Sequence, residues 1–129
     1  MDDGSALSAL SGKVIQHAMQ VHSALGPGLL ESAYEICLAH ELQQAGLSVA
    51  RQVALPVRYR GLHLEAAYRL DLVVNDTLVG EVKAVEKMLP LHVAQLLSYL
   101  RMGDFRLGLL INFNVTHLRQ GIKRVANGV

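Results

Sequence analysis

Apolar side chains recur at the spacing of an α-helix in the first third of the chain. The first set lies on one face of a helix expected over residues 5–25, which Gly26-Pro27-Gly28 ends: Val14, Ala18, Val21 and Leu25. A second helix is expected over residues 29–45, because Gly46 stands where a helix C-terminus favours a left-handed residue. Its apolar face would hold Leu30, Ala33, Tyr34, Cys37, Leu38 and Leu42.

From residue 47 onward the apolar period becomes that of a β-strand. The alternating residues are Val49, Val53, Leu55, Val57 and Tyr59, followed after a turn at Gly61 by Leu62 and Leu64. Two further apolar runs, 68–74 and 78–85, flank Asn75-Asp76-Thr77, whose residue types favour a hairpin. The segment therefore predicts a β-meander whose last two runs are central strands.

The last third of the chain predicts a helix, a strand and a second helix. Pro90 suits the first turn of a helix over residues 91–102, and Gly103 follows it. The nearly continuous apolar run within residues 106–113 is typical of a strand covered on both faces. Residues 115–125 are expected to form a short helix that turns Leu118, Ile122 and Val125 inward. The fold class expected is α/β, a three-layer sandwich with a central mixed β-sheet flanked by helices.

The length and composition of the chain are those of a protein with one hydrophobic core. The chain has 129 residues, of which 51% are hydrophobic and 18% charged, so we expect a single domain over residues 1–129. Cys37 has no cysteine partner and is expected to act as a small buried hydrophobe. Neither a secretory signal nor a membrane-length apolar run is evident, so the cytoplasm is the expected location. A net charge of +1 neither demands nor excludes a nucleic-acid partner.

Three charged residues lie among apolar neighbours in residues 70–74 and 78–85 of the expected hairpin. Asp71 lies in the first run, and Glu81 and Lys83 lie in the second, where they point to the same face of a strand. Burying isolated charges is costly, so they need partners, a metal ion or a solvent-filled cleft. If the hairpin brings Asp71 beside Glu81, the Val82 carbonyl and Lys83 converge on the same spot. Mg²⁺ or Mn²⁺ would suit this set, and one of the two carboxylates should have a raised pKa.

The same pattern admits a structural interpretation, in which Lys83 pairs with a carboxylate on a half-exposed strand. Two helix pairs favour a functional site instead. Glu31 and Tyr34 share one helix face, and Gln95 and Tyr99 share another. Each of these residues alone is commonly a capping glutamate or a satisfied buried tyrosine. Together they are too many inward polar groups for an idle core.

Several sequence blocks together resemble the GxxExxY proteins, a family within the PD-(D/E)xK nuclease superfamily. The signature block is Leu25-Gly26-Pro27-Gly28-Leu29-Leu30-Glu31-Ser32-Ala33-Tyr34. The similarity continues through Tyr68-Arg69-Leu70-Asp71, Glu81-Val82-Lys83-Ala84-Val85-Glu86-Lys87, Leu89-Pro90-Leu91-His92, Ala94-Gln95-Leu96-Leu97-Ser98-Tyr99-Leu100 and Gly108-Leu109-Leu110-Ile111-Asn112-Phe113-Asn114. It extends over nearly all of the chain from about residue 13.

The resemblance implies a restriction-endonuclease-like core whose central hairpin carries the active site. The catalytic residues it implies are Asp71, Glu81, Lys83 and Glu31. The metal ligands would be Asp71, Glu81 and the Val82 carbonyl, and the residues bordering the substrate would be Gln95, Tyr99 and Tyr34. Gly80 departs from the family pattern, which has a large aliphatic residue before the glutamate, and glycine weakens a strand.

These residues give three expectations for function. The first is a metal-dependent nuclease that hydrolyses phosphodiester bonds in nucleic acid, with DNA as the expected substrate. The second is a non-catalytic nucleic-acid-binding or assembly subunit that keeps the nuclease fold. The third is a structural homodimer whose polar cleft binds a small anion. A homodimer or an accessory protein partner is compatible with each of them, and no Cys/His spacing indicates a zinc site.

Overall fold

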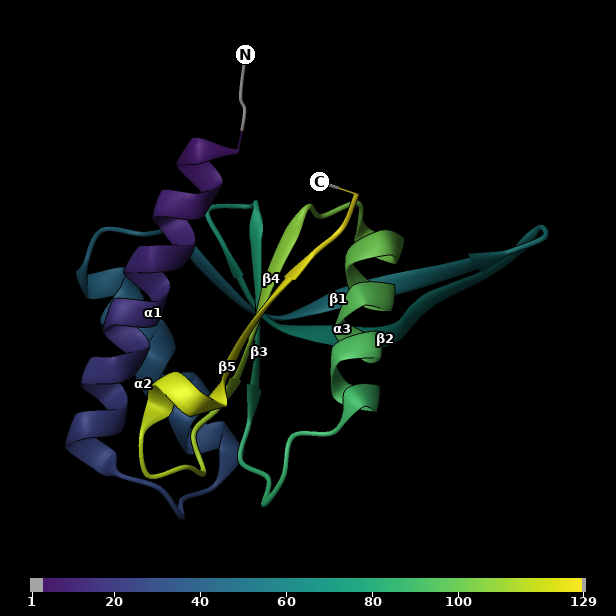
Figure 1. Ribbon diagram of the computed structural model, residues 1–129. Helices are drawn as coiled ribbons and strands as arrows, with labels where there is room; N and C mark the ends of the chain where they lie inside the picture. The colour runs from purple at the N-terminus through teal and green to yellow at the C-terminus, as the bar shows by residue number, and fades with distance from the viewer. Residues whose placement is uncertain (1–3, 129) are drawn as a thin grey trace.

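The computed structural model describes residues 4–128, which form a five-stranded mixed sheet with helices on both faces (Figure 1). Along the chain the elements are α1 (Ser5–Leu25), α2 (Glu31–Gln44), β1 (Val49–Tyr59), β2 (Leu62–Val74), β3 (Leu78–Lys83), α3 (Pro90–Gly103), β4 (Leu107–Asn112), η1 (Leu118–Gly121) and β5 (Ile122–Ala126). The strands lie in the order β1-β2-β3-β4-β5. The three-layer α/β sandwich with a mixed sheet is therefore confirmed.

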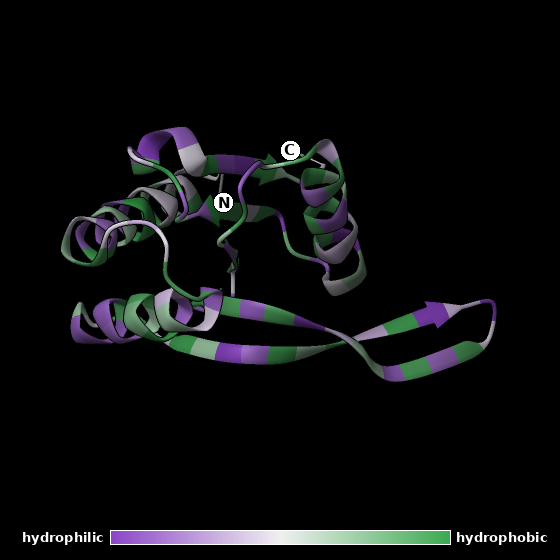
Figure 2. Ribbon diagram, turned by 90° about the horizontal axis from the view of Figure 1, so that it is seen from below, coloured by the Kyte–Doolittle hydropathy of each residue, from purple (hydrophilic) through white to green (hydrophobic). Residues whose placement is uncertain are grey.

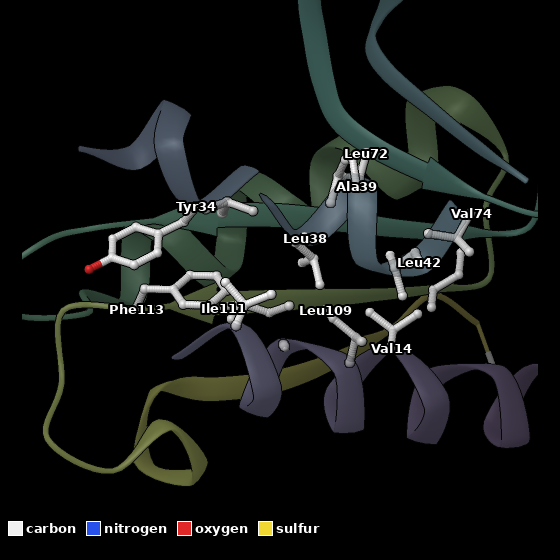
Figure 3. Close-up of a cluster of buried hydrophobic side chains, with 14 of the residues drawn as sticks. Val14, Tyr34, Leu38, Ala39, Leu42, Leu72, Val74, Leu109, Ile111 and Phe113 are labelled. Carbon is white, nitrogen blue, oxygen red and sulfur yellow. The ribbon is translucent and has the colours of Figure 1, made fainter. Parts of the chain in front are cut away.

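Helices α1 and α2 cover one face of the sheet. Val14 and Ala18 of α1 and Leu38 of α2 are buried against sheet residues such as Leu109 (Figure 3). The helical period of the sequence follows this burial, because one stripe of each helix faces the strands. Helix α2 begins at Glu31, however, so Leu30 precedes the helix and is 76% exposed rather than inward.

Helix α3 covers the opposite face, and it connects β3 to β4. Leu96 and Leu100 of α3 pack with Val79 of β3 and Leu110 of β4 in a second buried cluster. Strands β3 and β4 are parallel, with Glu81 opposite Leu110. Helix α3 is thus the crossover between two parallel strands, and β4 is buried along its whole length because helices cover both of its faces.

The hairpin between β2 and β3 turns at the residues that the sequence indicated. Asn75 and Asp76 have positive φ angles of 50° and 56°. Thr77 N donates to Val74 O at 3.1 Å and closes the turn. Asparagine and aspartate tolerate left-handed backbone at low cost, and two such residues match the twist of a hairpin.

Strand β2 is longer than expected, because the run from Leu62 and the run 68–74 form one continuous strand. The outer part of the β1–β2 hairpin extends beyond the sheet (Figures 1 and 2). Pairing between the two strands shifts register between Leu55 and Val57, which marks a bulge. The segment called the arm from here on, residues 56–69, comprises the part beyond this point and, at its base, Tyr68 and Arg69, which pair with Leu55 and Ala54.

The prediction of a C-terminal helix over residues 115–125 is wrong. A short 3₁₀ turn, Leu118–Gly121, is followed by strand β5, which pairs antiparallel with β4. The three apolar residues have helical spacing, but they serve opposite sides of the sheet. Leu118 and Ile122 pack in the α1/α2 layer, whereas Val125 packs in the α3 layer. Ile122 and Val125 are three apart, so a strand places them on opposite faces, where each meets a different helix layer. Three buried apolar residues at this spacing therefore fit a strand between two layers as well as a helix.

Candidate active site

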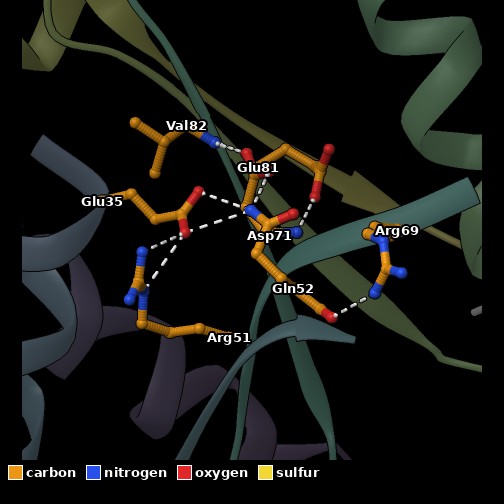
Figure 4. Close-up of polar contacts among 7 residues, drawn as sticks. All are labelled: Glu35, Arg51, Gln52, Arg69, Asp71, Glu81 and Val82. Carbon is orange, nitrogen blue, oxygen red and sulfur yellow. Dashed lines mark hydrogen bonds and ion pairs between the residues drawn. The ribbon is translucent and has the colours of Figure 1, made fainter. Parts of the chain in front are cut away.

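Strands β2 and β3 separate at Asp71. Their ladder ends at the pair Leu72 and Gly80, and beyond it side chains replace backbone pairing. The Asp71 backbone N–H donates to Glu81 Oε2 at 2.7 Å, and the Val82 N–H donates to Asp71 Oδ2 at 2.8 Å (Figure 4). The hairpin therefore brings the two carboxylates together in a gap between the strands, as the sequence spacing predicted.

The Val82 carbonyl faces the same gap. In a strand the N–H and the C=O of one residue point to the same side. Lys83 directs its carbonyl towards β4, where Phe113 N donates to it at 2.9 Å. Val82 consequently faces β2, and its N–H already contacts Asp71. Two carboxylates and one carbonyl oxygen converge where β2 and β3 no longer pair.

Burial and mutual repulsion perturb both carboxyl groups. Burial, followed by the negative charge of Asp71, raises the pKa of Glu81 from 4.5 to about 8. Burial also raises the pKa of Asp71, and the charges of Glu35 and Glu31 act in the same direction. Lys83 lowers the pKa of both groups without offsetting the burial. The raised carboxyl pKa expected from the sequence is confirmed, and a cation in the gap would relieve the repulsion that contributes to it.

Lys83 lies at the end of β3. By strand alternation it shares the face of Val79 and Glu81, which is the face covered by α3. Among residues 4–128, no carboxylate lies within 4.0 Å of its ammonium group. The structural interpretation required a salt bridge to Lys83, so it does not explain why Asp71, Glu81 and Lys83 lie in these strands. Lys83 is left half-buried beside two carboxylates.

Three polar residues that the sequence analysis passed over support Asp71. Glu35 is only 5% exposed, and Arg51 Nη2 donates to its Oε2 at 2.9 Å. Gln52 Nε2 donates to Glu35 Oε1 at 2.9 Å and to Asp71 Oδ1 at 3.3 Å (Figure 4). The available sequence signal was the spacing of Glu31 and Glu35, which are four apart and therefore lie near one face of the helix.

Gln52 reaches Asp71 because its backbone leaves the regular strand conformation. Its φ is 53°, in the left-handed region, although it lies within β1. The β1–β2 ladder pairs Arg51 with Leu72 and Val53 with Leu70 but omits the intervening pair. Arg69 Nη1 donates to the Gln52 carbonyl at 3.3 Å and helps to hold this conformation. A left-handed non-glycine residue costs on the order of 1–3 kcal/mol, and such residues cluster at functional sites.

Glu31 approaches the strand end from the α1/α2 layer. It is the first residue of α2, and its Oε2 accepts a hydrogen bond from Ala84 N at 3.3 Å. Its charge contributes to the raised pKa of Asp71. Glu31 therefore lies near Asp71, whereas Glu81 and Lys83 point towards the α3 layer.

Helix α3 contributes Tyr99 to the other side of the site. Its side chain is 8% exposed, and burial followed by the charge of Glu81 raises the pKa of its phenol. Its ring centroid is 5.4 Å from that of Tyr68 on β2. Gln95 lies one helical turn earlier and is exposed, so the expectation that it points inward is wrong.

Tyr34 points away from the gap. Its ring is fully buried and stacks on Phe113 with centroids 4.5 Å apart. Its hydroxyl donates to Gly26 O and accepts from Leu29 N at 3.1 Å. These contacts fix the loop between α1 and α2, so the structure gives Tyr34 a packing role that the sequence analysis had not separated from substrate contact.

Gly80 fits its strand without leaving a hole. It is buried, and a Cβ added at this position would lie 3.5 Å from Leu72 Cβ, at ordinary van der Waals distance. Leu72 therefore packs against the glycine, and the position of Glu81 does not depend on a large neighbour.

The donor set fits a hard divalent cation. Among residues 4–128, no group of three or more His, Cys, Asp and Glu side chains is arranged to hold a metal ion. The gap instead supplies two carboxylates and the Val82 carbonyl. Mg²⁺ commonly takes one or two carboxylates and keeps several of its waters, so a third side-chain ligand is not required.

Comparison with known proteins agrees with this geometry. The family model described as the PD-(D/E)XK nuclease superfamily matches residues 8–125. The chain belongs to this superfamily. Glu81-Val82-Lys83 has the spacing of the (D/E)XK part of that name, whereas Leu70 stands before Asp71 where the name has a proline. Neither the curated proteins nor the solved structures gave a match. None of the helices described is both long and apolar enough to cross a membrane.

Proposed function

We propose that this protein is a nuclease that hydrolyses phosphodiester bonds in nucleic acid, with DNA as its substrate and Mg²⁺ or Mn²⁺ as its cofactor. The observation that carries the proposal is the convergence of Asp71, Glu81 and the Val82 carbonyl in the gap between β2 and β3. Membership of the PD-(D/E)XK nuclease superfamily supports it.

Asp71, Glu81 and Val82 would hold the cation in this proposal. Bound there, the cation would make a water molecule more acidic and would neutralise charge on the phosphate. Lys83 Nζ would donate a hydrogen bond to the attacking water and orient it towards phosphorus. Glu31 of α2, whose carboxylate accepts a hydrogen bond from Ala84 just beyond β3, would contribute a further acceptor at the rim of the gap.

Helix α3 would border the substrate. Tyr99 adjoins the acidic gap, and Gln95 is exposed one turn earlier on the same helix. These two residues are four apart on one helix and belong to one of the sequence blocks that resemble the GxxExxY proteins. With the Glu31 and Tyr34 block and the remaining blocks, they support a finer assignment to the GxxExxY proteins.

A second candidate function is a nucleic-acid-binding subunit without catalysis. It is favoured by the small number of acidic ligands, since no third carboxylate, histidine or cysteine in residues 4–128 completes a metal-binding cluster. In this case the fold would bind nucleic acid while a partner supplies the chemistry.

Cleavage assays separate the two candidates. Labelled single-stranded DNA, duplex DNA and RNA would each be incubated with the protein in Mg²⁺, in Mn²⁺ and in chelator. Cleavage that requires the cation and is lost in Lys83→Ala supports the nuclease. Lys87→Ala provides the matched control, because Lys87 is exposed and lies just beyond β3. Equal cleavage by the two variants would contradict the proposed role of Lys83, and binding without cleavage by wild type would support the second candidate.

A further inference from the structure

The arm projects from the sheet, and every residue from 58 to 69 is exposed. All residues from 62 to 69 of β2 are exposed, whereas β2 residues from 70 onward enter the core. Arg60 and Gly61, both with positive φ, form the tight turn at its tip. An isolated two-stranded ribbon is marginal in water. A partner that covers one face of the arm would therefore stabilise it.

Positive charge is concentrated in the arm. Residues 56–69 contain Arg58, Arg60 and Arg69 against one acidic residue, Glu65, which gives a formal charge of +2 with histidine neutral, whereas the whole chain carries +1. The site itself is rich in carboxylates, so it repels a phosphodiester when no cation is bound. Attraction of a polyanion must come from elsewhere on the molecule, and the arm offers these cations.

One face of the arm is aromatic and apolar. The pairs Val57–Leu64 and Tyr59–Leu62 lie opposite each other, and paired residues project to the same face. Tyr59 is 62% exposed and Leu62 is 57% exposed. By alternation from Leu55, which is buried with α3 residues, this face continues the α3 side of the sheet. Figure 2 shows the alternating apolar and polar bands along the arm.

Aromatic rings connect this face to the active site. The Arg60 guanidinium lies 5.4 Å from the centre of the Tyr59 ring at the tip. Tyr68, at the base, is 46% exposed, and its ring contacts that of Tyr99. Tyr99 in turn lies within electrostatic reach of Glu81 and Asp71. Exposed rings and adjacent cations therefore lead from the tip of the arm towards the acidic gap.

We propose that the arm binds single-stranded nucleic acid along the edge formed by β1 and guides it to the active site, with bases stacked on Tyr59 and Tyr68. Its phosphates pair with Arg60, which lies over the Tyr59 ring, and with Arg58, which projects to the opposite face of the same edge strand. The proposal rests on the proposed function and names the substrate class of that same site. Unpaired bases present apolar faces that fit exposed rings, whereas a duplex hides them. The excess of arginine over glutamate complements a polyanion and not a second copy of a chain with the same positive arm.

Binding can be measured in chelator, so that cleavage does not interfere. Fluorescence anisotropy of labelled oligothymidylate would be recorded for wild type, for Tyr59→Ala and for Arg58→Ala/Arg60→Ala. Tyr59→Ala should raise Kd by about tenfold or more, since stacking of one base alone accounts for about that factor. Arg58→Ala/Arg60→Ala should raise Kd by about tenfold or more because two phosphate contacts are lost. The double variant should also reduce the magnitude of the slope of log Kd against log salt by about 1.4, because each neutralised phosphate of a single strand contributes about 0.7.

The matched control removes the same charge from the opposite edge of the sheet. Arg119 of η1 and Lys123 of β5 are exposed there, so Arg119→Ala/Lys123→Ala should leave Kd within about twofold of wild type if the arm supplies the phosphate contacts. An equal loss of affinity in this control would overturn the proposal. So would tighter binding to a duplex of the same length, or arm variants that change the oligomeric mass in light scattering and leave Kd unchanged.

The outcomes also separate the arm from the nuclease. If wild type fails to cleave but the arm variants lose binding, the arm proposal stands and the nuclease proposal fails. If wild type cleaves single strands and the arm variants cleave them with unchanged KM, the arm proposal fails and the nuclease proposal stands.

Discussion

The Asp71 amide nitrogen lies 2.7 Å from Glu81 Oε2, so the backbone of one acidic residue holds the side chain of the other. The contact occurs one residue beyond the last β2–β3 pair, Leu72 with Gly80. Side chains thus complete hydrogen bonding where the two strands diverge, and the carboxylates gain fixed positions in the gap between them. The following predictions depend on this arrangement.

Metal-free protein should lose stability as pH rises. The Glu81 pKa is about 8 in the folded protein and 4.5 without the influence of the fold, so the folded state keeps a proton that the unfolded chain has released. This contribution to stability is complete below pH 4.5 and is lost as the pH approaches 8. Its size is on the order of a few kcal/mol, since one pKa unit corresponds to about 1.4 kcal/mol. Urea denaturation in chelator across this range measures it.

The variant Glu81→Gln isolates this titration. Glutamine resembles the protonated carboxyl group and can still accept the Asp71 N–H, so most of the pH dependence should disappear. Parallel stability curves for the wild type and the variant would mean that another group causes the change.

Divalent cations should stabilise the wild type and not Asp71→Asn. At a hundredfold excess over Kd, Mn²⁺ should add ~2.7 kcal/mol. This corresponds to a rise in Tm on the order of 5–10 °C. The asparagine oxygen can keep the Val82 N–H bond while the negative charge is lost, so Tm in chelator should not fall by more than a few degrees. Thermal melts at matched ionic strength test this, and an equal response to Mn²⁺ in both proteins would exclude Asp71 as a ligand.

Gln52→Gly should weaken metal binding without unfolding the protein. Glycine adopts the φ of 53° freely but lacks the amide that joins Glu35 to Asp71. Loss of such a supporting contact typically lowers metal affinity by about 10–100-fold. Calorimetric titration with Mn²⁺ gives the affinity. Arg60→Gly is the matched control, because Arg60 also has a positive φ but lies at the tip of the arm, and its Mn²⁺ affinity should equal that of wild type.

Tyr34→Phe should affect stability and spare cleavage. Removing the hydroxyl deprives Gly26 O and Leu29 N of their partner, which should cost about 1 kcal/mol. The ring and its stacking on Phe113 remain. Denaturation and cleavage assays on the same preparation distinguish this packing role from substrate contact. A fall in kcat with unchanged stability would show that the phenol acts in the reaction.

Much of the fold follows from the sequence because it depends on local pattern. The helix over 5–25 and the turn at Asn75 and Asp76 are specified by nearby residues and agree with the structure. The proximity of Asp71 and Glu81 can also be predicted from the sequence, since they are charged residues in two apolar strands joined by a short turn. Where strands and turn are fixed, their proximity follows.

Tertiary structure decided what local pattern leaves open. Leu118, Ile122 and Val125 have helical spacing, but β4 offers a free edge to the C-terminal segment, and pairing with it places these residues in two different layers. The Glu35 and Gln52 contact joins a helix to a strand, and neither residue stands out in its own segment. Hydrophobic periodicity reports which side of an element is buried. It does not report which distant segment covers that side, and that pairing fixes both the last strand and the residues that support Asp71.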